Sequence, residues 1–216
     1  MLESFLKPLI ANWPMLLALG GFYLFFRFMK SATGKGWIGE KMVSQIGLRQ
    51  MDPAVYRVFD DIYLPRTDGK GTTQIDHVVV SKFGVFVIET KNMKGWIFGS
   101  PEQRQWTQQL FRKKSRFQNP VHQNALHVRA LQSFLGLAAD YFHPLVFFVG
   151  ECEFKTPMPD NVRSSGLKDW ILAKQTPQLS ESEVETAVGK LASLVAATDK
   201  RQTSKEHVKA CKQRMK

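Results

Sequence analysis

The pattern of apolar and polar positions predicts several short strands. The clearest apolar runs are 75–80 (IDHVVV) and 85–88 (VFVI), which a short polar stretch ending at Gly84 separates. Both runs are rich in β-branched and aromatic residues, which is typical of buried strands, and their short connection predicts an antiparallel hairpin. The run 144–149 predicts a further strand. The segment 162–174 predicts another strand, whose apolar part is Trp170-Ile171-Leu172.

Helices are predicted where apolar residues recur at helical spacing. The first spans about 38–48. A second begins at Asn119-Pro120, a side-chain cap followed by proline, and continues to about Leu135. A third opens with Ser180 and Glu183, which form the sequence signature of a capping box. Its apolar stripe indicates that it packs on a sheet.

A different pattern precedes these elements. From Pro8 to Phe26 the chain carries no charged residue, and this length suits one membrane crossing, which takes ~20 apolar residues. We therefore predict a transmembrane helix over about 8–28 and an exit linker to residue 33. A cleaved signal peptide or a buried core helix are the alternatives. Lys and Arg follow the segment, which favours a single-pass inner-membrane protein with its C-terminal part in the cytoplasm.

Three charged residues stand out within the predicted hairpin. If the turn is centred between Lys82 and Phe83, Asp76 lies directly opposite Glu89, and Lys91 follows on the same face. Two facing carboxylates repel each other, and a hard cation such as Mg²⁺ or Mn²⁺ relieves this by binding oxygen atoms from both. The trio therefore favours metal-assisted attack on a phosphodiester. A structural ion pair that includes Lys91 is the alternative.

The composition points to a polyanionic partner. The 216 residues have a net charge of +11 and a pI of about 9.7, which favours nucleic acid or anionic lipid. The clearest local cluster of basic residues precedes the Asn119 helix and is interleaved with aromatic residues that would suit base stacking. Its members are Arg104, Arg112, Lys113, Lys114 and Arg116. A solvated loop, or a loop that touches lipid headgroups, would explain the same cluster.

Several blocks of the sequence resemble one known family. They are GWIGE at 36–40, QIDH at 74–77, FGVFVIETKN at 83–92 and NPxxQ at 119–123. Together they resemble the NERD (nuclease-related) domain, a relative of the PD-(D/E)xK restriction-endonuclease-like nucleases. The resemblance covers about 34–150 and implies an α/β fold, in which a mixed β-sheet is flanked by helices, and a divalent-metal nuclease site.

The resemblance also suggests roles for two further residues. Gln123 would reach the site and orient water or phosphate, or it would only tie helix to sheet. Glu40 would supply a third carboxylate to the metal, although a glutamate that starts a helix is also favoured in solvent by the helix dipole. The predicted catalytic residues are thus Asp76, Glu89, Lys91 and Gln123, and the predicted metal ligands are Asp76, Glu89 and Glu40.

These observations predict three regions: a membrane anchor over 1–33, a nuclease-related domain over 34–198 and a basic tail over 199–216. The predicted function is divalent-metal-dependent hydrolysis of nucleic acid, with DNA favoured over RNA, at the membrane. The alternative is a non-catalytic tethered module that binds nucleic acid or a protein partner. Gly20-Gly21 in the anchor permits close pairing of two helices, and therefore a homo-oligomer.

Overall fold

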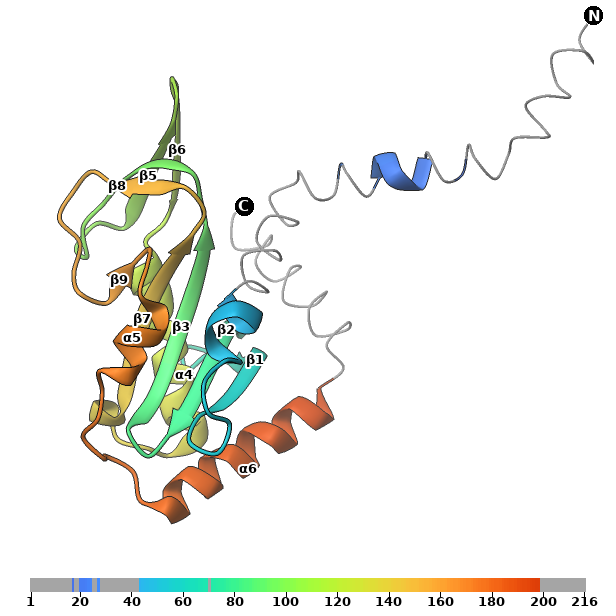
Figure 1. Cartoon of the computed structure of the whole chain (residues 1–216), viewed down its shortest axis with the longest axis vertical. Helices are drawn as coiled ribbons and strands as arrows, with labels where there is room; N and C mark the ends of the chain where they lie inside the picture. Colours follow the sequence, from blue (N-terminus) through green and yellow to red (C-terminus); the bar gives the residue numbers. More distant parts are fainter. Residues whose placement is uncertain (1–16, 18–19, 25–26, 28–42, 70, 199–216) are drawn as a thin grey trace, which may run out of the picture. The chain divides into compact units, whose positions relative to one another are not determined.

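The computed structural model describes residues 17, 20–24, 27, 43–69 and 71–198 (Figure 1). The chain divides into two compact units, Met1–Ile38 and Gly39–Lys216. In the first unit the described residues are helical, and Leu17, Phe22, Tyr23 and Leu24 are all more than half exposed. No helix among the described residues is long and apolar enough to cross a membrane. Most of the predicted span 8–28 lies outside them.

A five-stranded mixed sheet is the centre of the second unit (Figure 1). Strands β1, β2 and β3 are antiparallel neighbours, and β7 and β9 continue the sheet in parallel with β3. The strands are β1 (Arg57–Pro65), β2 (Thr72–Ser81), β3 (Gly84–Asn92), β7 (Phe142–Val149) and β9 (Val162–Arg163). The predicted strands at 75–80, 85–88 and 144–149 are therefore confirmed.

The β2–β3 hairpin has the predicted register. Ser81 pairs with Gly84, and each following pair keeps the same index sum as far as His77 and Ile88. Gly84 has φ 121°, and a Cβ atom there would lie 2.7 Å from the Tyr141 carbonyl oxygen. Only glycine combines this conformation with so close an approach, so Gly84 sets the turn and, through it, the strand register.

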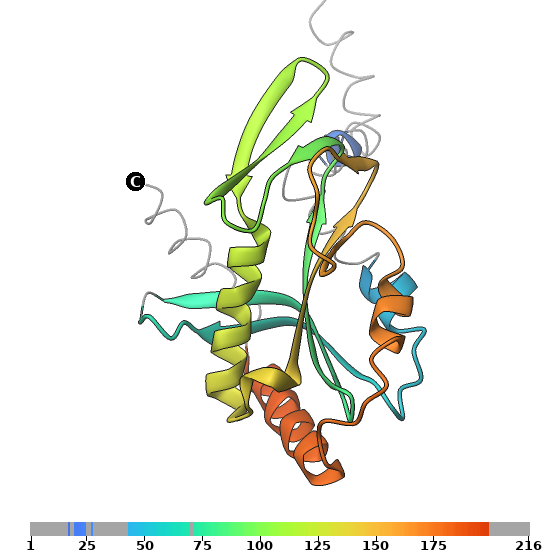
Figure 2. The same ribbon diagram turned by 90° about the vertical axis from the view of Figure 1, so that its left-hand side faces the viewer.

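A second, four-stranded sheet continues from the end of β3. Its strand order is β6-β5-β4-β8, with β4 and β8 parallel. The strands are β4 (Gly95–Phe98), β5 (Gln105–Leu110), β6 (Lys113–Gln118) and β8 (Cys152–Phe154). Strands β5 and β6 form a hairpin that projects from the body of the unit (Figure 2). The sequence pattern indicated only a basic cluster in this region.

Helices cover both faces of the larger sheet. Helices α4 (Pro120–Leu135) and α6 (Glu181–Ala197) pack on one face, over a core that includes Val78, Val87 and Leu131. The other face is covered by the π-helical turn η1 (Val43–Leu48) and α5 (Leu167–Leu172). A short 3₁₀ turn, η2 (Ala139–Tyr141), leads into β7. The result is a mixed α/β architecture with helices on both sides.

The helices predicted to begin near Asn119 and Ser180 are confirmed, and one strand prediction is wrong. Asn119 caps α4 through Val121 N–H, and Ser180 and Glu183 form the predicted capping box of α6. The described part of the predicted 38–48 helix is helical from Val43. The strand predicted within 162–174 exists only as β9, because Trp170 and Ile171 lie on α5. Three consecutive apolar residues fit a buried helical turn as well as a strand.

Candidate active site

The two predicted carboxylates lie at neighbouring positions on β2 and β3. The pairing of the two strands extends to His77 and Ile88, and the next residue on each strand is Asp76 or Glu89. The Thr90 backbone N–H donates to Asp76 Oδ2 at 2.7 Å, which ties the Asp76 carboxylate to β3. The structure therefore brings Asp76 beside the Glu89-Thr90-Lys91 segment, as the hairpin register predicts.

Glu89 is a buried carboxylate whose two oxygen atoms both accept hydrogen bonds. The Lys91 ammonium donates to Oε1, and His127 Nε2 lies 2.9 Å from Oε2. The Glu89 side chain is only 2% exposed, whereas that of Lys91 is 18% exposed. Lys91 thus neutralises the buried charge from the solvent side of the site.

The environment of Glu89 holds it ionised. Burial by itself would raise the pKa of this carboxyl group. The Lys91 charge and the His127 hydrogen bond act in the opposite direction and lower the Glu89 pKa from 4.5 to about 2. The Glu89 carboxyl group beside Asp76 is therefore held in its charged form.

Helix α4 supplies the remaining polar groups. Lys91 Nζ donates to Gln123 Oε1 at 3.0 Å, a hydrogen bond that joins the helix to β3 and is compatible with both roles suggested for Gln123. One helical turn later, the buried His127 lies between Glu89 and Thr73, whose hydroxyl oxygen is 2.8 Å from His127 Nδ1. An imidazole protonated on Nε2 satisfies both neighbours, because it donates to the carboxylate and accepts from the hydroxyl.

Two asparagines fix the position of α4 over these strands. Asn124 Nδ2 donates to the carbonyls of Val87 (2.9 Å) and Leu145 (3.0 Å), on the parallel neighbours β3 and β7. Asn119 caps the helix with its oxygen and binds three carbonyls of the β4–β5 loop with its nitrogen. Because both side chains are buried and bonded, the first two turns of α4 are held rigidly against the sheet.

Sequence reasoning did not assign His127 or Thr73 to the site. His127 had one visible signal, since it lies one helical turn from Gln123. Asp61 lies on β1 at the level of Asp76, has φ 58°, and accepts from Gln74 Nε2 at 3.1 Å. A positive φ at a non-glycine residue is uncommon, and no pattern in the sequence marks it.

His77 takes no part in this site. Its Nδ1 lies 2.8 Å from Asp60 Oδ1, and Asp60 also forms an ion pair with Arg49. His77 is 1% exposed and neighbours residues of the core that faces α5. Because successive residues of a strand point to opposite faces, His77 points away from the face of Asp76.

The remaining predicted site residues are Glu40 and the five members of the basic cluster. Glu40 falls outside the described residues. The five basic residues of the cluster lie on or beside the β5–β6 hairpin. Of the aromatic residues interleaved with them, Trp106 is fully buried, Phe117 is half-buried and Phe111 is 90% exposed. The structure therefore leaves Phe111 as the fully exposed aromatic residue of this cluster.

The donor set at Asp76 and Glu89 suits a hard cation. Both groups offer carboxylate oxygens, and a carboxylate oxygen can accept more than one contact. Among the described residues there is no group of three or more His, Cys, Asp and Glu side chains that would hold a metal by itself. Mg²⁺ is commonly bound by one or two carboxylates together with water and substrate phosphate, so the residues present fit it.

These features define a class of protein: a mixed α/β domain with paired carboxylates and a lysine on adjacent strands, braced by a helix. The family model of the nuclease-related domain (NERD) matches residues 35–149. This chain belongs to the nuclease-related domain family. The resemblance seen in the sequence is thereby confirmed, and the family is consistent with a restriction-endonuclease-like relationship.

One curated relative is also similar. The uncharacterized protein pXO1-01 of Bacillus anthracis is 50% identical over 98 residues, which are 45% of this chain and 45% of the relative. The match thus spans less than half of that protein's length. No solved structure matches this chain significantly.

Proposed function

We propose that this protein hydrolyses phosphodiester bonds of nucleic acid at a membrane, with Mg²⁺ or Mn²⁺ as cofactor. The observation that carries the proposal is the buried, ionised Glu89 next to Asp76. Lys91 donates hydrogen bonds to both Glu89 and Gln123. Charged groups are rarely buried together unless they form ion pairs or take part in function. Solvent reaches this group at Lys91, which is more exposed than Glu89. Membership of a nuclease-related family supports the same chemistry.

Each residue has a role in this proposal. Asp76 and Glu89 would hold the metal, and Glu40 is proposed as a third ligand. When bound, the metal would supply Lewis-acid polarisation of the phosphodiester. Lys91 would orient the attacking water and stabilise negative charge on the phosphate. Gln123 holds Lys91 Nζ, and His127 holds the second oxygen of Glu89, so both act as positioning residues.

The membrane part of the proposal rests on the N-terminal unit. The uncharged run from Pro8 to Phe26 supports it, because its length suits one membrane crossing. The basic residues that follow it favour a cytoplasmic catalytic domain. The basic hairpin is proposed as the nucleic-acid-binding surface, with DNA favoured over RNA.

A second function is favoured by one specific observation. Both oxygens of Glu89 are already bonded, to Lys91 and His127, which is also how a purely structural ion pair would be satisfied. The second candidate is therefore a non-catalytic tethered module that retains the nuclease fold and binds nucleic acid or a protein partner.

Cleavage by matched variants distinguishes the two candidates. Full-length protein in mild detergent would be incubated with labelled single- and double-stranded DNA and RNA, in Mg²⁺, Mn²⁺ or chelator. Asp76→Asn removes the charge but keeps an oxygen that accepts from Thr90 N–H, so it preserves the local fold. Glu153→Gln is the control, because Glu153 is an exposed carboxylate on β8.

We expect metal-dependent cleavage that Asp76→Asn abolishes and Glu153→Gln retains. If folded wild-type protein cleaves none of the substrates but binds them equally in chelator, the binding module is correct. If cleavage survives Asp76→Asn, the proposed site is wrong.

A further inference from the structure

The β5–β6 hairpin ends in an unusual turn. Leu110 pairs with Lys113, so Phe111 and Arg112 form a two-residue connection. Phe111 has φ 54°, and only it and Asp61 have a positive φ among the described non-glycine residues. The first position of such a hairpin turn favours glycine when its φ is positive. A bulky aromatic residue there costs conformational free energy, and strain of this kind is often kept at binding sites.

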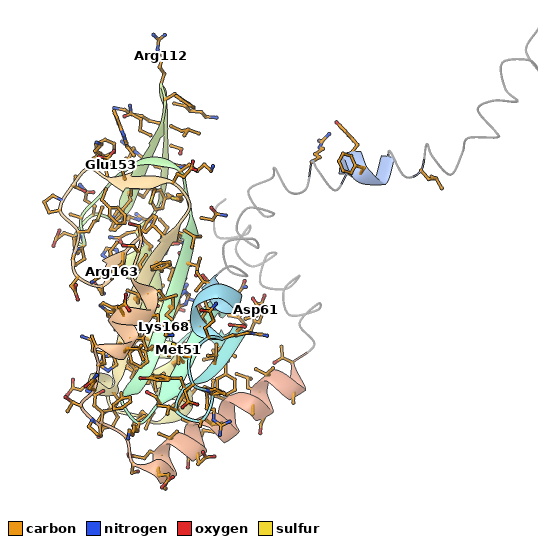
Figure 3. The ribbon with its side chains drawn as sticks, in the orientation of Figure 1. Met51, Asp61, Arg112, Glu153, Arg163 and Lys168 are labelled. Atoms are coloured by element: carbon orange, nitrogen blue, oxygen red, sulfur yellow. The ribbon has the colours of Figure 1, made fainter. Side chains whose placement is uncertain are left out.

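Nothing in the fold requires Phe111 to be aromatic. Its side chain is 90% exposed, and it belongs to none of the hydrophobic core clusters of the described residues. The neighbouring Arg112 lies at the far end of the hairpin, pointing away from the body (Figure 3). The turn thus presents an apolar ring and a cation at the point where the hairpin reaches furthest.

The hairpin behind this tip carries only positive charge. No Asp or Glu occurs between Glu102 and Asp140. None of the five basic residues of the cluster takes part in an ion pair in the part of the chain that the structure describes. Unpaired cations on an exposed ribbon are complementary to a polyanion.

Basic residues occupy both faces of the ribbon. Arg116 pairs with Thr107 and Lys114 with Gln109 on one face, whereas Lys113 pairs with Leu110 on the other. A groove of about 440 Å³ is lined by Phe98, Thr107, Lys114, Ser115 and Arg116. Polar and cationic side chains in that groove suit a phosphate backbone.

The base of the ribbon is fixed to the candidate active site. Strand β3 ends at Asn92, directly after Lys91, and leads into β4. Strand β6 ends at Gln118, directly before the Asn119 cap of the helix that carries Gln123. A nucleic acid that lies along the ribbon would therefore pass close to the site.

We propose that the β5–β6 hairpin enters a groove of duplex DNA and that Phe111 wedges against a base step there, unstacking it. This inference rests on the proposed function and names its substrate class. A two-stranded ribbon fits the major groove of B-form DNA, about 12 Å wide. Side chains cannot read the deep, narrow major groove of duplex RNA. Other DNA-binding proteins insert apolar side chains between base steps from the minor groove and partly unstack them.

The test measures unstacking without cleavage. Full-length protein in chelator would be titrated with a DNA duplex containing 2-aminopurine, whose fluorescence rises when it unstacks, and affinity would be followed by anisotropy. Phe111→Gly removes the ring and relieves the positive φ, so it leaves the hairpin intact. Phe111→Leu keeps an apolar wedge, and Trp96→Ala removes a different exposed aromatic side chain of the same sheet.

We expect a fluorescence rise with wild type, Phe111→Leu and Trp96→Ala. Phe111→Gly should lose it and bind the duplex at least about fivefold more weakly, as stacking energies indicate. A duplex RNA of the same sequence should give no rise. An unchanged signal and affinity with Phe111→Gly would overturn the proposal.

A membrane contact is the competing outcome. The chain would be placed in nanodiscs of phosphatidylcholine with or without phosphatidylserine, and Phe111→Trp would be probed by quenching from brominated lipid. Quenching of the added tryptophan, together with an aminopurine signal independent of residue 111, would assign the tip to lipid and overturn the DNA inference.

These results also separate the inference from the proposed function. If the protein cleaves no substrate but gives an aminopurine signal that depends on Phe111, the inference that the hairpin binds DNA stands and the proposed nuclease function is wrong. If the protein cleaves DNA, Phe111→Gly leaves cleavage unchanged and no aminopurine signal appears, the nuclease function stands and the inference about the hairpin is wrong.

Discussion

The candidate active site and the β5–β6 hairpin place charge in opposite ways. In the site, the buried Glu89 shares its oxygens between Lys91 and His127, and each partner has a defined geometry. On the hairpin, cations such as Lys114 and Arg116 are exposed and make no ion pair with other described residues. The free energy of a buried charge depends on each neighbouring group, whereas exposed charges act mainly through their total charge. The two regions should therefore respond differently to mutation.

The largest expected effect is the loss of Lys91. Lys91→Ala leaves the Glu89 charge buried without its cation, which typically destabilises a protein by about 3–5 kcal/mol. Urea unfolding measures the change. Lys94→Ala is the matched control, because Lys94 is 61% exposed, and its loss should matter little. Adding Glu89→Gln to Lys91→Ala should restore part of the stability, and a purely additive double mutant would contradict the coupling.

A smaller effect is expected from His127. His127→Ala leaves Thr73 and one oxygen of Glu89 without a buried partner, at a cost of about 1–3 kcal/mol. If the protein is a nuclease, the Mg²⁺ concentration for half-maximal cleavage should also rise about 10–100-fold, as for other groups that orient metal ligands. His122→Ala is the control, because His122 is exposed on the same helix. A loss of stability without any change in Mg²⁺ dependence would limit His127 to a structural role.

The stability of the protein at acidic pH should depend on the charge of Glu89. The Glu89 pKa is lowered to about 2 in the folded protein from 4.5, so its ionisation stabilises the fold fully above pH 4.5. That contribution is lost as the pH falls from 4.5 towards 2. Urea midpoints measured across this range should fall more steeply for wild type than for Glu89→Gln. Parallel curves would show that Glu89 is not held ionised by its neighbours.

The smallest effect on stability is expected from the hairpin. Replacing Lys113, Lys114 and Arg116 together by Gln should change the free energy of unfolding by no more than about 0.5 kcal/mol per position, because these side chains are exposed. Binding should respond instead. The slope of log affinity against log salt for duplex DNA should become shallower by about 0.9 for each phosphate that the variant no longer neutralises. An unchanged slope, measured by anisotropy in chelator, would exclude the hairpin from the interface.

Local signals in the sequence were sufficient for much of the fold. The hairpin register follows from a turn that ends in Gly84, where a side chain would collide with the Tyr141 carbonyl. The start of α4 follows from Asn119-Pro120, and that of α6 from its capping box. Part of helix α5 was predicted as a strand, because three consecutive apolar residues are too few to distinguish helical from strand periodicity. No sequence pattern predicted strand β1, in which Asp61 has a positive φ.

The sequence by itself determined that Asp76 and Glu89 lie at neighbouring positions, because an antiparallel hairpin of fixed turn has one register. It also determined the excess of positive charge before the α4 helix, which is a matter of composition. Only the tertiary structure decided that His127 bridges Glu89 to Thr73, that Trp106 is buried and that Phe111 is exposed. Those outcomes depend on how a helix and a second sheet pack against strands distant in the chain, and side-chain periodicity carries no information about such packing.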